Sequence, residues 1–409
     1  MFDILAACEA ANHYAVEIYT QLHRHPELSG QETETLRLIG KEMTSMDISY
    51  VEVPQGGILG CITGKGGGTG KTVLLRADCD ALPMQESTCN ARQAKRIVSQ
   101  KDGAAHTCGH DTHVSMLLAA ARILKEHADA YPGKVLLLFE RGEETGEYIQ
   151  NVLDYVDTNR IRIDSCFAVH VTADLPVGQV GIPSGSTNAG CFPFDIELTG
   201  RGGHGSTPSK VNNPIDCFQL IMAALKDIRM KYVSPFDPAT IQVCTVHAGD
   251  AFNVTPETLR FSGSCRYFRP EVGKDLTDRL RRTIDSSAQL CGCEVIYHRF
   301  QEQYMPSYND PHCAALSRSV VMKIIPEENI RPRNQAMGSE SFGALSTRYP
   351  SVKANTGVRN ERAGMIDPTH SPRFEADPGG MTYGTMLYVS YAAAYLNEPP
   401  DCCVSFIGE

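Results

Sequence analysis

The sequence predicts an α/β protein with a mostly parallel sheet and a smaller α+β module inserted into it. Short apolar runs that end in polar residues alternate with helical patterns, and strands that alternate with helices indicate a mostly parallel sheet. In the middle of the chain the order changes to strand, helix, strand, strand, helix, strand, which is typical of a split βαβ module. The length of 409 residues exceeds what one hydrophobic core usually serves, so we expect two domains.

An amphipathic helix is expected at the N-terminus, within MFDILAACEAANHYAVEIYTQLHRH. The runs TVLLRADCD, KVLLLFERGEE and SCFAVHVTAD each predict a buried strand whose last residues turn polar. Between the first two lies a helical pattern, HVSMLLAAARILKEHADA. Ligands gather at the carboxyl ends of parallel strands. Because Asp78, Glu143, Glu144 and His170 fall at such ends, we expect a functional site there.

The change of pattern sets the expected domain boundaries. The inserted module comprises FPFDIELTGRGGHG, a helix around PIDCFQLIMAALKDIRMKY, the strands IQVCTVHAGD and LRFSGSCRYF, and a helix around DLTDRLRRTIDSSAQL. We therefore expect residues 1–186 and 297–409 to form one domain and residues 187–296 to form the other. A long loop near the C-terminus, ERAGMIDPTHSPRFEAD, carries His370.

The composition is that of an ordinary soluble globular protein, with 42% hydrophobic and 21% charged residues. A formal net charge of -10 argues against nucleic-acid and acidic-membrane partners, because both select a basic face. No apolar stretch approaches the roughly 20 residues of a membrane span, and acidic residues interrupt the N-terminal segment, unlike a signal peptide. The 15 cysteines lack the spacing of a secreted disulfide scaffold. We therefore expect a cytoplasmic protein.

The densest group of potential metal ligands is HTCGHDTH, at residues 106–113. Cys108 and His110 are two residues apart, so both side chains can face the same side of an extended segment or tight loop. Gly109 between them lets the backbone turn sharply. This spacing indicates a metal site.

Glu143 and Glu144 follow a buried strand and form a second signal. Neighbouring carboxylates at a strand end can point to different sides of one cavity, so one can bind a metal ion while the other takes a proton from the metal-bound water. The alternative is an acidic pair on a solvated loop.

Two further histidines are weaker candidates when each is taken alone. His170 closes the buried run SCFAVHV, where a hydrogen-bonded core histidine is the more common occupant, and His370 lies in THSP, which also suits a surface turn. With Cys108, His110 and a glutamate they form a ligand set that suits one or two ions of Zn, Mn, Co or Ni. A thiolate ligand argues against Mg and Ca.

Segments along the chain resemble, in the same order, motifs of the M20 metallopeptidase superfamily. They are HRHPELSGQE, LLRADCDALP, HTCGHDTH, FERGEE, AVHV, GRGGHGSTP, NVTP, MGSESF and THSP. The resemblance spans about residues 20–380 and is to the amidohydrolase branch, which includes N-acyl-amino-acid, auxin-conjugate and hippurate hydrolases. It implies a zinc-peptidase-like catalytic domain with a ferredoxin-like lid and dimerisation domain.

The resemblance also implies roles for individual residues. The ligands of a two-metal site would be Cys108, His110, Glu144, His170 and His370. Glu143 would be the general base, and Asp78 would orient a ligand. Arg76 stands where other branches have a metal-binding histidine, which together with Cys108 indicates the amidohydrolase branch. Asp111 and His113 are expected to brace the loop and the helix start.

The inserted domain contributes further candidates by resemblance. His204, in GRGGHGSTP, would reach the site of the partner subunit in a homodimer and polarise the scissile carbonyl; the alternative is a glycine-rich surface turn. Asn253 would lie near the substrate, and Arg266 would hold a substrate carboxylate.

Three segments depart from the family's pattern. Glu140-Arg141-Gly142 replaces the usual Gln-Pro-Ala before the two glutamates, Thr145-Gly146-Glu147 replaces a glycine run, and Ser341 replaces the aspartate of Glu-Asp-Phe. None of these changes removes an expected ligand or the base, so they bear on substrate preference.

The expected function is that of a metal-dependent amidohydrolase, which cleaves the amide of N-acyl amino acids or related small conjugates. Water activated by the metal and Glu143 would attack the carbonyl, and the metal and His204 would stabilise the oxyanion. One alternative is a dipeptidase or aminopeptidase of the same superfamily, which needs a pocket for a free amino group. Another is a non-catalytic, metal-binding regulatory relative, against which stands the complete set of ligands.

Overall fold

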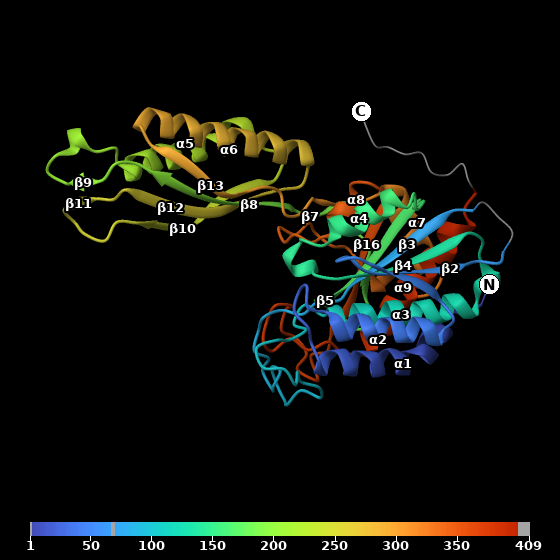
Figure 1. Ribbon diagram of the computed structural model, residues 1–409. Helices are drawn as coiled ribbons and strands as arrows, with labels where there is room; N and C mark the ends of the chain where they lie inside the picture. Colours follow the sequence, from blue (N-terminus) through green and yellow to red (C-terminus); the bar gives the residue numbers. More distant parts are fainter. Residues whose placement is uncertain (1, 67–69, 400–409) are drawn as a thin grey trace. The chain divides into compact units, whose positions relative to one another are not determined.

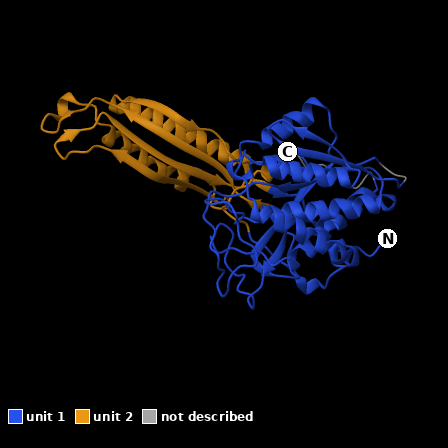
Figure 2. Cartoon of the chain, turned by 60° about the horizontal axis from the view of Figure 1, so that its bottom comes forward, with its two compact units in different colours: residues 1–185, 308–334, 344–409 blue, residues 186–307, 335–343 orange. Residues whose placement is uncertain are grey.

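The chain forms two compact units in a computed structural model that describes residues 2–66 and 70–399 (Figure 1). Unit 1 comprises residues 1–185, 308–334 and 344–409, and unit 2 comprises residues 186–307 and 335–343 (Figure 2). The sequence pattern placed the end of the inserted module at residue 296. That position lies inside strand β13 (Glu294–Phe300), which pairs with β8 (Gly190–Thr199) of unit 2. The inserted unit extends to residue 307 and also includes residues 335–343, which the sequence pattern had placed in the other domain.

The centre of unit 1 is an eight-stranded sheet with the order β1-β2-β4-β3-β5-β16-β6-β15. Its strands are β1 (Ser49–Val53), β2 (Gly57–Thr63), β3 (Thr72–Asp78), β4 (Lys134–Glu140), β5 (Ser165–Pro176), β6 (Val180–Gly181), β15 (Ile330–Arg331) and β16 (Ser351–Arg359). Strand β3 pairs in parallel with β4 and β5, and β5 pairs in parallel with β16, whereas β1 and β2 are antiparallel additions at one edge. The predicted mostly parallel sheet is confirmed.

Helices with long apolar faces cover this sheet. The helices of unit 1 include α1 (Ile4–Arg24), α2 (Thr33–Ser45), α3 (His110–Glu126), α4 (Ile149–Thr158), α7 (Pro311–Val321) and α9 (Gly379–Asn397), and the short helix α8 (Phe342–Ser346) spans a unit boundary. Helix α1 packs against α3 and α9, which also contact each other. None of the helices in the described part of the chain is long and apolar enough to cross a membrane.

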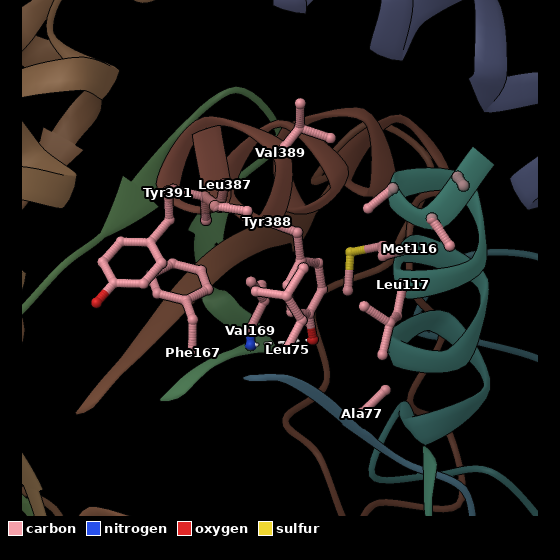
Figure 3. Packing of buried hydrophobic residues seen from close by; sticks show 14 of the residues in the cluster. Leu75, Ala77, Met116, Leu117, Phe167, Val169, Leu387, Tyr388, Val389 and Tyr391 are labelled. Atoms are coloured by element: carbon pink, nitrogen blue, oxygen red, sulfur yellow. Dashed lines mark hydrogen bonds between the residues drawn. The ribbon is translucent and has the colours of Figure 1, made fainter. Parts of the chain in front are cut away.

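Tyrosines of α9 fill the core between this helix and the sheet (Figure 3). Tyr391 stacks on Phe167 with ring centroids 4.3 Å apart. Tyr388 donates a hydrogen bond to the carbonyl of Arg76 at 2.6 Å and accepts one from the amide of Val169 at 3.2 Å. The buried hydroxyl is thereby satisfied, and α9 is tied to the strands that carry the candidate site.

The carboxyl ends of β3 and β4 carry polar side chains, as the sequence pattern predicts, whereas His170, expected at a strand end, lies inside β5 (Ser165–Pro176). Strand β3 ends at Asp78, and β4 ends at Glu140, just before a 3-10 turn at Glu143–Thr145. His170 lies within β5, paired in register with Asn355 of β16. Helix α3 begins at His110, so its first turn can join them.

Unit 2 is an antiparallel sheet packed against two helices. The sheet has the order β10-β12-β8-β13, with β10 at Ala239–Ala248 and β12 at Thr258–Tyr267. Helices α5 (Pro214–Tyr232) and α6 (Pro270–Cys291) contact each other and share one hydrophobic core with the sheet. The element order is strand, helix, strand, strand, helix, strand, as the sequence predicts. Strand β9 (Gly203–His204) pairs with β11 (Val254–Thr255).

Four buried charged side chains form a continuous chain of contacts in unit 1, which we call the buried ion chain. Nδ1 of His23 lies 2.6 Å from Asp111, and Nε2 of His23 lies 3.0 Å from Glu86. Lys95 donates to the same oxygen of Glu86 at 2.7 Å. Burial by itself lowers the pKa of His23, but the hydrogen bonds to Asp111 and Glu86 outweigh burial and raise this pKa to about 9.

Replacing His23 should therefore change how stability depends on pH. Because the pKa of His23 rises from an ordinary 6.5 to about 9 on folding, its stabilisation is fully present below pH 6.5 and is lost as the pH rises through 9. The loss of unfolding free energy caused by His23→Gln should be larger at pH 6.5 than at pH 9.5, by about 3 kcal/mol. Denaturant unfolding of both proteins at the two pH values measures this difference.

His13→Gln is the matched control for this measurement. His13 lies on the same helix but is exposed, so its replacement should leave the pH dependence unchanged. An equal loss for His23→Gln at both pH values would contradict the charged state of His23.

Candidate metal centre

Cys108 and His110 reach one site because α3 begins in a tight turn at Gly109. Gly109 has a φ of +95°, in the left-handed region that favours glycine. A Cβ atom at this position would lie 2.5 Å from Cγ2 of Val171. Glycine thus lets the segment from Cys108 to His110 approach β5 directly beside His170.

The first ligand group consists of Cys108, His110 and His170. Their potential ligand atoms all lie within 4.8 Å of one another, and Sγ of Cys108 is 3.7 Å from Nε2 of His170. All three side chains come from adjoining elements: the turn before α3, its first residue, and strand β5.

The second ligand group consists of Cys108, Glu144 and His370, again with ligand atoms within 4.8 Å of one another. Nε2 of His370 lies 3.3 Å from Sγ of Cys108 and 3.5 Å from Oε1 of Glu144. Cys108 belongs to both groups, so one sulfur atom lies between two potential ion positions. The structure therefore brings together all five ligands expected from the sequence.

The orientation of the ligand side chains fits a metal ion. Nδ1 of His170 donates to the carbonyl of Val171 at 2.7 Å, which leaves the Nε2 lone pair directed at the cluster. Nε2 of His110 and Oε1 of Glu144 are buried and make no hydrogen bond within residues 2–66 and 70–399. Buried polar atoms usually have partners, so these two suit coordination.

The electrostatics of the first ligand group also favour a cation. Burial by itself lowers the pKa of His110, but the charge of Asp78 and the hydrogen bond to Asp80 outweigh burial and raise this pKa well above its usual range. Burial, with a smaller effect of His113, lowers the pKa of His170, so its ring stays neutral. Burial raises the pKa of the Cys108 thiol, and a bound metal ion would stabilise its thiolate.

His113 braces the centre and does not offer a ligand atom, although Asp78, His110 and His113 lie within 4.8 Å of one another. Its Nδ1 donates to Asp78 at 2.5 Å, and its Nε2 accepts from the amide of Val171 at 3.0 Å. Both ring nitrogens are therefore occupied. The bracing role expected for His113 agrees with these contacts.

Asp80 is the carboxylate that hydrogen-bonds to the ligand His110. Its Oδ1 lies 3.1 Å from Nδ1 of His110, and its Oδ2 accepts from the amide of Glu144 at 2.9 Å. The family resemblance implied this orienting role for Asp78, and Asp80 was not among the residues expected from the sequence. The available signal was a second aspartate directly after the carboxyl end of a buried strand, where ligands gather.

Arg76 neutralises the acidic groups beneath the centre. Its buried guanidinium donates to Asp78 at 2.6 Å and to Glu140 at 2.7 Å. Burial by itself raises the pKa of Asp78, but the charge of Arg76 outweighs burial and holds this pKa well below its usual range. Asp78 is therefore a carboxylate, paired with Arg76 and His113.

Glu143 and Glu144 occupy a short turn with a left-handed glycine at each end, Gly142 (φ +64°) and Gly146 (φ +67°). Glu32 accepts a hydrogen bond from the amide of Gly142 at 2.7 Å and holds the start of the turn. Carboxylate oxygens of Glu143 and Glu144 lie within 4.8 Å of each other and of His110. Burial, together with a smaller effect of the neighbouring Glu144 carboxylate, raises the pKa of Glu143 well above its usual range.

The three remaining candidates belong to unit 2. His204 lies in β9, is exposed, and has Nδ1 2.8 Å from the hydroxyl of Ser206. Asn253 is exposed, and its carbonyl accepts from the amide of Gly205 at 2.8 Å. Arg266 lies in β12 and donates to Ser339 at 2.6 Å. These contacts place the three residues within unit 2 and assign them no chemical role.

Known proteins resemble the chain along nearly its whole length. It is 31% identical to an IAA-amino acid hydrolase of Arabidopsis thaliana, over 94% of this chain and 86% of that protein. It is 30% identical to a thermostable carboxypeptidase of Saccharolobus solfataricus, over 94% of this chain and 96% of that protein. Among solved structures, a dinuclear metal-binding peptidase from the M20 family, of Bacillus subtilis, matches with a TM-score of 0.78 and 25% identity, covering 95% and 99% of the two chains.

The family itself matches over most of unit 1 and all of unit 2. Residues 74–394 match Peptidase family M20/M25/M40, a range that contains every candidate ligand and the whole inserted unit. The resemblance inferred from the motifs is thus confirmed, and the chain belongs to Peptidase family M20/M25/M40.

Proposed function

We propose that the protein is a metal-dependent amidohydrolase that cleaves the amide bond of N-acyl amino acids or related small conjugates. The observation that carries the proposal is the pair of ligand groups that share Cys108, with the Glu143 carboxylate beside them. Hydrolases that use metal ions need such a division between ligands and a nearby base. The similarity to an IAA-amino acid hydrolase supports a substrate in which an amino acid forms the amine side of the amide.

Two divalent ions of Zn, Mn, Co or Ni would be held by Cys108, His110, Glu144, His170 and His370. When bound, such ions polarise a carbonyl group and lower the pKa of water. The described cysteines, including Cys108, are free. This supports a thiolate ligand and is compatible with a protein that works in a reducing compartment such as the cytoplasm.

Glu143 would move the proton. As general base it would take a proton from the attacking water, and as general acid it would pass that proton to the nitrogen of the leaving amino acid. Its position in a buried turn supports this role, because the turn is held by Glu32 and by the hydrogen bond from the amide of Glu144 to Asp80. Asp78 would orient the centre through its contacts with Arg76 and His113.

Unit 2 would act as a lid and dimerisation domain. In a homodimer, His204 would stabilise the oxyanion in the site of the partner subunit, while Asn253 and Arg266 would contact the substrate. The exposure of His204 in the two-stranded β9–β11 sheet supports a role outside its own fold. A monomeric mass in light scattering, together with full activity, would exclude the role in the partner's site.

A carboxypeptidase is the second candidate, because a thermostable carboxypeptidase is similar over nearly the whole chain. Hydrolysis of an N-acyl amino acid and removal of a C-terminal residue both release an amino acid, so the two activities share one leaving group. Rates on acetyl-, benzoyl- and indoleacetyl-amino acids should exceed those on dipeptides with the same C-terminal residue. Faster cleavage of dipeptides with a free amino group would instead favour a dipeptidase.

Glu143→Gln should lower kcat by about 10²-fold or more, because the amide side chain cannot take the proton. Its metal content should equal that of the wild type. Steady-state hydrolysis of an N-acyl amino acid and elemental analysis of the same sample measure both quantities. Glu9→Gln, which changes an exposed carboxylate of α1, is the control and should keep full activity. Full hydrolysis by Glu143→Gln would exclude Glu143 as the base.

Cys108→Ala and His370→Ala should differ in the number of ions lost. Cys108 belongs to both ligand groups and His370 to one, so Cys108→Ala should release both ions and His370→Ala only one. Elemental analysis after equilibrium dialysis against Co²⁺ measures the stoichiometry. Cys89→Ala, at an exposed cysteine, should bind as much metal as the wild type. Retention of both ions by Cys108→Ala would contradict the shared sulfur.

A further inference from the structure

His370 is an expected ligand whose own conformation is unfavourable. Its φ of +62° lies in the left-handed region. Glycine adopts this conformation readily, whereas other residues do so rarely, although asparagine, aspartate and histidine are found there more often than the rest. Its side chain is 53% exposed, so core packing does not hold the ring. Such a backbone persists only where the surrounding structure restrains it. The restraint on His370 must therefore come from contacts of the loop around it.

One restraint is a backbone hydrogen bond within the centre. The amide of His370 donates to the carbonyl of Thr107 at 2.8 Å. Thr107 precedes the shared ligand Cys108, so this bond joins the two ligand segments directly. It fixes one point of the loop and leaves the direction of the following residues to other contacts.

Lys95 supplies the second restraint. Its ammonium group donates to the carbonyl of Pro372 at 3.0 Å and to the carbonyl of Phe374 at 2.7 Å. Its third bond goes to Glu86 at 2.7 Å. An ammonium group has three donors, and all three are used within a side chain that is fully buried. Lys95 therefore binds the loop of His370 at two points, two and four residues after the histidine.

The buried ion chain connects Lys95 to the segment that carries His110, a member of the first ligand group. Glu86 lies between Lys95 and His23, and His23 contacts Asp111, the residue after His110. Burial by itself raises the pKa of Glu86, but hydrogen bonds from His23 and Lys95 outweigh burial and lower this pKa to about 2. The buried ion chain thus begins at Asp111, next to His110 of the first ligand group, and ends at the loop that carries His370 of the second.

We propose that Lys95 is a positioning residue of the metal centre, which holds the loop of residues 370–374 so that His370 stays within ligand distance of Cys108 and Glu144. This inference rests on the proposed function for the assignment of His370 as a ligand. The three hydrogen bonds of Lys95 go to Glu86, Pro372 and Phe374, and none of them goes to an expected ligand atom. Its loss should act on one ion position, because the first ligand group does not contain His370.

Lys95→Met tests the proposal, since methionine fills similar space and donates no hydrogen bond. Chelator-treated protein is titrated with Co²⁺ alone, and bound metal is measured by equilibrium dialysis. The wild type should bind about two ions per chain. In Lys95→Met the first ion should bind as in the wild type, while the second should bind about 10- to 100-fold more weakly. His370→Ala should show the same pattern.

Lys71→Met is the matched control. Lys71 is also buried, but it lies just before the amino end of β3, where its ammonium donates to the carbonyl of Pro399 at 3.3 Å. Its loss costs a buried charge in the same unit without touching the ligand loops. Lys71→Met should therefore keep both ions. Lys95→Arg, which retains the charge and donors, should recover part of the second site. If Lys95→Met does not fold, Lys95→Gln replaces it with the same expectation.

The outcomes separate this inference from the proposed function. Two ions bound by Lys95→Met with wild-type affinities would overturn the positioning role and leave the metal centre intact. Equal weakening in Lys71→Met would also overturn it, because the effect would then follow from general destabilisation. A wild type that binds fewer than two Co²⁺ ions would overturn the two-ion centre itself, and the inference with it.

Discussion

The close approach of the Gly109 backbone to Val171 is the constraint on which the metal centre depends. A side chain at Gly109 would collide with β5, so only glycine allows the turn before α3 to lie against this strand. The turn brings Cys108 and His110 beside His170 and starts the helix at the ligand itself. Because Cys108 is shared by both ligand groups, one backbone turn determines the geometry of the two expected ion positions.

Buried charged groups around the centre pair with one another. In the described part of the chain their hydrogen bonds do not use Nε2 of His110 or Oε1 of Glu144, which stay available for a metal ion. Arg76 binds Asp78, and the buried ion chain from Asp111 to Lys95 alternates in sign. Unpaired charges at these depths would be strongly destabilising. Pairing also fixes geometry, because each pair joins segments far apart in sequence. These buried ion pairs thus contribute to the stability of the fold, and the same contacts also position the segments that carry the expected ligands.

Much of this arrangement could be predicted from the sequence because it depends on local patterns. Polar residues that follow apolar strands placed Glu143, Glu144 and His170 at a shared sheet edge, and the spacing of Cys108 and His110 indicated a common site. The same reasoning underestimated the inserted unit, whose last strand continues past residue 296. Exposed, polar positions alternate along that strand, and only its pairing with β8 shows where it ends.

The sequence by itself determined the fold class, the family and the candidate ligand types, because hydrophobic periodicity and short motifs are properties of neighbouring residues. The tertiary structure decided that Asp80 bonds to His110 and that Lys95 holds the loop of His370. Lys95 and Phe374 are separated by 279 residues, and no local pattern links them. Their contact exists because long-range packing of the sheet and helices closes the loops over one another, and a buried ammonium group must then find three acceptors.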